Sequence, residues 1–154
     1  MALSARRTPE RAGPLLSGVV LQKLSVTPIT LTTGGGVRTL TAAETLGGFL
    51  ALNCDDAQTC KFPTATALNA GIPGVEEGTA IYLDVINYGD TTATFAINTG
   101  ITNYTPVTVV SVLTMATLTA RKFLLICTGV NGVNGKTADS WNLYSFGITA
   151  AAVA

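Results

Sequence analysis

The chain has 154 residues, a length that normally forms one domain and buries roughly 70% of the surface of its unfolded chain. Charged residues make up only 12% of it and hydrophobic residues 47%, so the surface has little electrostatic repulsion. Nine basic and nine acidic residues cancel, which argues against a general nucleic-acid-binding protein. We therefore expect a protein that works inside an assembly that hides much of its surface.

Residues 1–24 are interpreted as an extended N-terminal arm, because residues 1–18 contain proline and glycine and show no sustained hydrophobic period. Residues 19–24 could alternatively add to the domain as a strand. The arm has four basic residues and one acidic residue, so it carries a charge of +3 and the rest of the chain −3. Its basic residues are Arg6, Arg7, Arg11 and Lys23. This asymmetry favours attachment of the arm to an acidic partner, and a solvated tail that binds nothing is the open alternative.

Neither a secretory signal nor a membrane-spanning segment is expected. The residues after the arginine pair are polar, and the uncharged stretch 91–120 is interrupted by glycine and proline. Three cysteines without a signal peptide favour a reducing compartment and buried free thiols. A disulfide between Cys54 and Cys60 stays open, since their spacing permits it without requiring it.

The first half of the chain contains short strands and two short helices. Strands are predicted over 26–32, 37–41 and 49–53, where apolar residues lie between turn residues. The spacing of Thr41 and Glu44 is that of a capping box, which predicts one helical turn. Thr64 predicts a second helix start, because a threonine side chain accepts a hydrogen bond from the first turn.

The stretch 62–100 has the clearest pattern in the chain. Apolar residues alternate over 81–87, a turn follows at 88–90, and the alternation resumes over 91–97. Alternation on both sides of a Gly-Asp turn predicts a β-hairpin.

The later strands are predicted over 107–112, 114–119, 121–128 and 140–147. Both faces of 121–128 are apolar, so this strand is expected at the centre of its sheet. Asn-Gly pairs place a loop over Asn131–Lys136. In the last strand we expect Trp141 and Tyr144 to pack in the core.

Eight or more short strands at intervals of about ten residues predict an all-β protein. The expected architecture is a single antiparallel β-sandwich or jelly roll over 25–149, with the arm at 1–24 and a short tail at 150–154. The chain shows no sequence repeat of about 20–50 residues, so a solenoid is not expected.

No catalytic, cofactor or metal site is expected. The chain has no histidine, which removes the usual nucleophile–histidine pairs and most zinc sites. The acidic pairs Asp55-Asp56 and Glu76-Glu77 are interpreted as solvated loop residues, with a calcium site at the first pair as a minor alternative. Tyr88 and Tyr104 lie in predicted turns and are candidates for exposed partner contacts.

Several segments resemble small β-rich virion proteins. They are Phe62-Pro63-Thr64-Ala65-Thr66-Ala67-Leu68, Ile72-Pro73-Gly74, Gly78-Thr79, Val85-Ile86-Asn87 and Asn98-Thr99-Gly100, followed by a late aromatic strand. Together they look like jelly-roll decoration, minor capsid and fibre-associated proteins of phages and large DNA viruses. The resemblance covers about residues 26–147 and implies a structural role without catalytic residues.

The leading hypothesis is a non-enzymatic virion protein that decorates or cements a capsid surface after assembly in the host cytoplasm. It would form a homotrimer and bind major capsid or other virion proteins through its arm and a face of its domain, with no role at a membrane or on a specific nucleic acid. The alternative is a receptor- or carbohydrate-binding head of a viral fibre or spike, which would use Tyr88, Tyr104 and the loop Asn131–Lys136.

Overall fold

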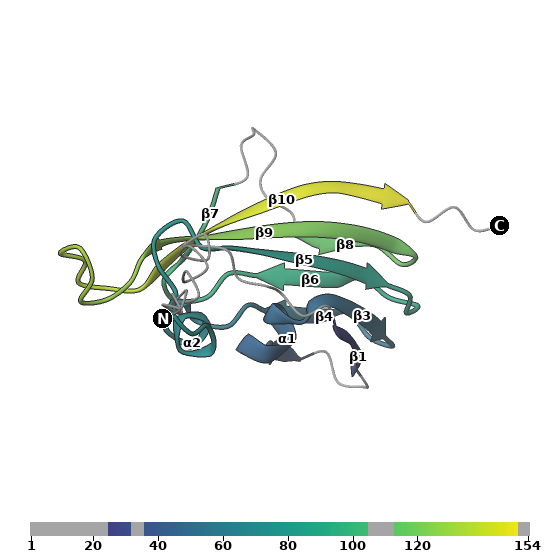
Figure 1. Cartoon of the computed structure of the whole chain (residues 1–154). Helices are drawn as coiled ribbons and strands as arrows, with labels where there is room; N and C mark the ends of the chain where they lie inside the picture. Colours follow the sequence, from purple (N-terminus) through teal and green to yellow (C-terminus); the bar gives the residue numbers. More distant parts are fainter. Residues whose placement is uncertain (1–24, 32–35, 105–112, 151–154) are drawn as a thin grey trace, which may run out of the picture.

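The computed structural model describes residues 25–31, 36–104 and 113–150, which contain two β-sheets and two short helices (Figure 1). In spatial order, sheet A contains β1 (Ser25–Leu31), β3 (Gly48–Cys54), β5 (Ala80–Asn87), β9 (Thr119–Gly129), β10 (Ser140–Ala150) and β7 (Ile101–Asn103). Sheet B contains β2 (Val37–Thr39), β4 (Gln58–Lys61), β6 (Ala93–Ala96) and β8 (Thr114–Met115). The expected β-rich fold is therefore confirmed. The expected arm at 1–24, strand at 107–112 and last tail residues 151–154 lie outside the described residues.

The prediction of purely antiparallel pairing is wrong, because both sheets are mixed. In sheet A, β1 pairs with β3 and β3 with β5 in parallel, whereas β9 is antiparallel to both β5 and β10. In sheet B, β2, β4 and β6 run parallel, and β8 closes the sheet with an antiparallel pair. At the other edge of sheet A, β7 pairs with β10 in parallel, so both early and late strands of the chain form parallel pairs.

The first six strands alternate between the two sheets. The chain passes from β1 in sheet A to β2 in sheet B and returns to β3, and it repeats this path through β4, β5 and β6. Strand partners accordingly lie one turn of this path apart, as Val37 and Thr59 do in sheet B. The chain follows this coiled path although its sequence contains no repeat. The absence of a repeat was therefore not evidence against a coiled, solenoid-like path.

The predicted hairpin over 81–97 is also wrong, although both of its strands are present. β5 lies in sheet A and β6 in sheet B, so the turn between them carries the chain across the core. The side chain of Asn87, at the end of β5, is fully buried and holds this crossing. Its amide nitrogen donates to the carbonyl oxygen of Thr91 at 2.8 Å, and its Oδ1 accepts from the Gly89 N–H at 3.2 Å.

Both helices begin where the sequence predicts. α1 (Ala42–Leu46) starts with a complete capping box, in which the Thr41 hydroxyl accepts from the Glu44 N–H and the Glu44 carboxylate accepts from the Thr41 N–H. α2 (Ala65–Gly71) starts at the Thr64 cap. Each helix lies on a connection from sheet B back to sheet A.

Aromatic rings join the two sheets in one hydrophobic core. Phe123 of β9 and Phe95 of β6 have ring centroids 5.0 Å apart, and Phe62 contacts both rings. Trp141 is fully buried, as expected, and its indole nitrogen donates to Asn69 Oδ1 of α2 at 2.7 Å. β9 lies between β5 and β10, so its predicted position inside the sheet is confirmed.

Candidate functional site

The sequence-predicted contact residues are distributed over distant parts of the molecule. Arg6, Arg7, Arg11 and Lys23 lie outside the described residues. Tyr88 and Tyr104 are exposed, with 45% and 56% of their surface accessible. Tyr88 follows the last residue of β5, whereas the loop Asn131–Lys136 joins β9 to β10 near the first residue of β5. An eight-residue strand spans about 26 Å, so Tyr88 and this loop do not form one site.

The side of sheet A that points away from the core forms a broad surface, which we call the outer A face. Along β3, β5, β9 and β10 its residues alternate with fully or nearly fully buried ones. Its residues are Phe49, Ala51, Asn53, Ala80, Tyr82, Asp84, Ile86, Ala120, Lys122, Leu124, Ile126, Thr128, Asn142, Tyr144 and Phe146. Most of them are aliphatic or aromatic.

One row of this face crosses four strands. Phe49 of β3 pairs with Asp84 of β5, Asp84 pairs with Lys122 of β9, and Lys122 pairs with Phe146 of β10. The two charged residues form an ion pair, with 3.4 Å between Lys122 Nζ and Asp84 Oδ1. The charges in the middle of the row therefore largely neutralise each other.

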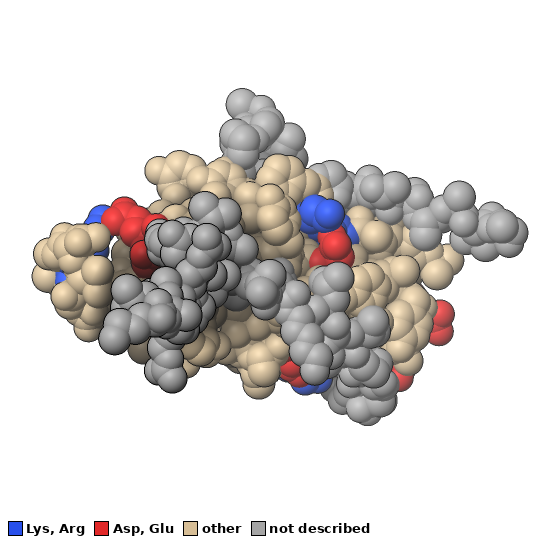
Figure 2. All heavy atoms as spheres, in the orientation of Figure 1, with Lys and Arg blue, Asp and Glu red and all other residues tan. Residues whose placement is uncertain are grey.

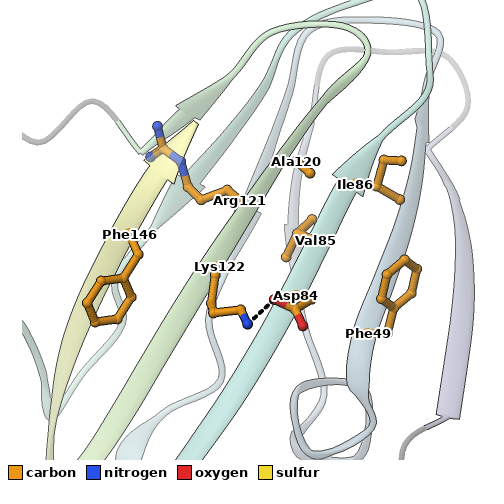
Figure 3. A pocket seen from close by; sticks show the side chains of 8 residues that line it. All are labelled: Phe49, Asp84, Val85, Ile86, Ala120, Arg121, Lys122 and Phe146. Carbon is orange, nitrogen blue, oxygen red and sulfur yellow. Dashed lines mark ion pairs between the residues drawn. The ribbon is translucent and has the colours of Figure 1, made fainter. Parts of the chain in front are cut away.

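The same row lines a hollow of about 450 Å³. Figure 3 shows Phe49 and Ile86 on one side of the hollow, Phe146 on the other, and the Asp84–Lys122 ion pair between them. Phe146 leaves 49% of its surface accessible. Arg121 also lines the hollow, together with the apolar residues Val85 and Ala120. The phenyl rings and these aliphatic groups give the hollow apolar walls that suit an aliphatic side chain.

A second row lies next to the first and is also apolar. Tyr82 of β5 pairs with Leu124 of β9, and Leu124 pairs with Tyr144 of β10. Tyr82 is 53% exposed, and the Tyr144 ring lies 6.1 Å from the ring of Tyr104. Tyr144 is thus half-buried on the outer A face, and the prediction that it packs in the core is wrong. Because strand residues alternate between faces, it points away from the buried Trp141 and Leu143.

The opposite surface, on sheet B, has a different composition. Its outward residues are Val37, Thr39, Thr59, Lys61, Thr94, Ala96 and Thr114. Four of these seven are threonines, whose hydroxyl groups interact well with water. The two sheets therefore present one polar face and one apolar face.

Charged groups are sparse on the surface shown in Figure 2, where most described atoms belong to neither acids nor bases. Among the described residues, no group of three or more Cys, Asp or Glu side chains is placed to hold a metal ion. Within the same ranges, neither helix has the length and apolar character needed to cross a membrane.

The three cysteines are free and buried. Burial raises the pKa of the Cys60 thiol to about 12 and also raises the pKa of Cys54 and of Cys127. A nucleophilic cysteine needs a lowered pKa, so these thiols are suited to packing.

Asp139 has a structural role between α2 and the loop after β9. Its carboxylate accepts from the Asn131 backbone N–H at 2.9 Å and from the Asn69 side-chain amide at 2.7 Å. Hydrogen bonds from the Asn131 backbone and from the Thr66 and Asn69 side chains hold the pKa of Asp139 below its ordinary value. Asn69 in turn accepts from the Trp141 indole, which links this surface carboxylate to the core.

The outer A face is not among the features predicted above, although the sequence contains a signal for it. Leu124 and Ile126 make the second face of β9 apolar, which indicates more than a central strand. A strand that is apolar on both sides also indicates that its outer side needs a cover.

Comparison with known proteins returned no similarity. No protein-family model matches the chain, and searches of curated proteins and of solved structures found no match either.

Proposed function

We propose that this protein is a non-enzymatic structural component of a virus particle that decorates or cements a capsid. In this proposal residues 25–149 form one β-sandwich head, and the outer A face is the surface that binds major capsid subunits or other virion proteins. The observation that carries the proposal is the contrast between the apolar outer A face and the threonine-rich outer face of sheet B. Segments such as Phe62–Leu68 resemble small virion proteins, and for this reason we propose a virus particle as the assembly.

The composition of the outer A face fits a protein interface. Its aromatic residues, Phe49, Tyr82, Tyr144 and Phe146, belong to the types enriched in interface centres, and its residues Asp84 and Lys122 form an ion pair. Burying such a face contributes about 25 cal/mol for each Å² of apolar surface. In a capsid this gain recurs at every symmetric copy, so moderate affinity for one subunit suffices.

The size of the face supports a role for the arm as well. Four strands spaced ~4.8 Å apart and eight residues long cover about 500 Å². A standard protein interface buries about 800 Å² on each partner. We infer that the arm supplies the remaining contact area, with Arg6, Arg7 and Arg11 directed to an acidic surface of a neighbouring virion protein.

The test is attachment to particles. Leu124→Glu places a charge in the middle of the outer A face, and Thr94→Glu places the same charge on the outer face of sheet B. Particles mixed with each variant would be purified, and bound protein would be quantified by mass spectrometry. We expect Leu124→Glu to reduce occupancy at least about tenfold, a loss of ~1.4 kcal/mol, with Thr94→Glu close to wild type. Equal occupancy of all three proteins would refute the assignment of this face.

The alternative function, a receptor- or carbohydrate-binding head, has one supporting observation. The exposed Tyr104 ring lies against the half-buried Tyr144 ring, and an exposed tyrosine ring can stack on a sugar. Binding on a glycan array that is lost in Tyr104→Ala but retained in Leu124→Glu would favour this alternative.

A further inference from the structure

The outer A face raises a question about the protein before assembly, when no partner covers it. Its hollow lies between Phe49 and Phe146 and is open to an apolar side chain (Figure 3). An uncovered apolar face promotes non-specific association. A protein that waits for its capsid therefore benefits from a temporary cover.

The N-terminal arm joins the sheet beside this face. β1 begins at Ser25 and forms the edge of sheet A, where Ser25 pairs with Gly48, the neighbour of Phe49. Twenty-four residues precede it. From β1 to β10 there are four strand spacings, or about 19 Å, whereas the eleven residues 14–24 reach about 36 Å when extended. Residues 14–24 are thus long enough to cross the face.

The composition of residues 14–24 matches the face. Six of these eleven residues are aliphatic, namely Leu15, Leu16, Val19, Val20, Leu21 and Leu24. Their single charge is that of Lys23, so a segment crossing the face brings little charge to the hollow. The three arginines lie earlier, in residues 1–13. The arm therefore divides into an apolar part next to the sheet and a basic tip.

A second copy of the chain is a less suitable cover. Two outer A faces pressed together would bury about 500 Å² on each copy, less than the ~800 Å² of a standard interface. A segment tethered beside the face instead acts at an effective concentration in the millimolar range. The covalent connection thus favours the arm of the same chain.

We propose that in the free protein residues 14–24 lie across the outer A face of their own chain, with one aliphatic side chain in the hollow between Phe49 and Phe146. This inference rests on the proposed function only for what replaces the segment, because a capsid subunit would take the same face. Residues 1–13 remain accessible in the free protein, and their arginines make the first contact with an acidic partner. During assembly, a capsid subunit then replaces residues 14–24 on the outer A face.

Limited digestion of the full-length protein with trypsin tests the inference, because the arm contains its own cleavage sites. Trypsin cuts after Arg11, in the tip, and after Lys23, in the covered part. In wild type we expect cleavage after Lys23 to be at least about tenfold slower than after Arg11, since proteolysis follows the population of the open form. Mass spectrometry of the products over time gives both rates in one sample.

Variants on the two faces supply the controls. Leu124→Glu and Phe146→Ser should bring the Lys23 rate up to the Arg11 rate, and Thr94→Glu should leave both rates unchanged. Near-ultraviolet circular dichroism of Trp141 checks that each variant is folded. Phe146→Ser keeps the test decisive if Leu124→Glu does not fold, because Phe146 is half-exposed.

Two results would overturn the inference. The first is cleavage of wild type after Lys23 as fast as after Arg11. The second is protection of Lys23 that disappears on dilution, which would assign the covering segment to another copy. The experiment contains no capsid, so its failure leaves particle attachment to be judged by its own assay.

Discussion

Asn87 offers the sharpest test of how the chain crosses from sheet A to sheet B. We consider Asn87→Asp, which keeps the shape of the side chain and exchanges its NH₂ donor for an oxygen. The buried amide nitrogen donates to the carbonyl oxygens of Thr91 at 2.8 Å and Ala116 at 3.2 Å, and that of Met115 lies at 3.4 Å. After the substitution an oxygen would face these carbonyl groups.

The expected loss of stability at pH 7 is about 4 kcal/mol, because two hydrogen bonds of ~1 kcal/mol each are lost and a charge is buried against carbonyl oxygens, which the Gly89 N–H offsets only in part. Burial against carbonyl oxygens raises the pKa of the introduced carboxyl in the folded state. A raised folded-state pKa means that the deficit shrinks as pH falls toward the unfolded-state value near 4. At pH 4 we expect about half of the loss to remain, since the protonated carboxyl donates one hydrogen bond.

Urea unfolding followed by Trp141 fluorescence measures this loss. The chain has one tryptophan, and it is fully buried in the folded protein. Asn142→Asp, on the half-buried outer A face, is the matched control and should change stability by less than about 0.5 kcal/mol. A loss below about 1 kcal/mol for Asn87→Asp at pH 7 would refute the assigned role of Asn87.

Two further predictions concern Asp139 and the thiols. The lowered pKa of Asp139 contributes stability that is present above its unfolded-state pKa and is lost as pH falls through its lower folded-state value. Thermal unfolding from pH 5 to pH 2 should therefore show a smaller decrease in Asp139→Asn than in wild type, and equal decreases would contradict this. The three buried thiols should not react with a disulfide reagent at pH 8 in the folded protein and should all react in urea; fast labelling of folded Cys60 would contradict its pKa of about 12.

Local signals in the sequence predicted local structure well. The side chains of Thr41 and Thr64 accept hydrogen bonds from the first turns of their helices, and both helix starts are confirmed. The central position of β9 and the burial of Trp141 are also confirmed. Each of these signals depends on residues within a few positions of one another, or on a side chain too large and apolar to leave in water.

The pairing of strands within the two sheets could not be predicted in the same way. Alternation over 81–87 and 91–97 shows that both strands have a buried face, but the same alternation fits a partner in either sheet. Asn87 distinguishes the two possible pairings, because its side-chain amide donates to the carbonyl oxygen of Ala116 in a distant segment as well as to that of Thr91 nearby. A sequence pattern does not contain such a long-range contact.

The candidate site was missed for a related reason. The row from Phe49 to Phe146 joins residues of four strands that are far apart in sequence. Its members become neighbours only after the mixed pairing of sheet A is known. The arm was predicted from composition and charge, and its contacts remain predictions.

The coiled path of the first six strands also governs where evolution can change the length of this chain. Phe49 pairs with Asp84 and Gln58 with Ala93, so in both sheets the partner lies 35 residues on. The preceding turn of the path is shorter, because Val37 pairs with Thr59 after only 22 residues. The longer turn includes α2, which extends the connection without shifting one sheet against the other. Relatives that gain or lose residues within this connection would keep both sheets in register, whereas an insertion within a strand would disrupt its pairing.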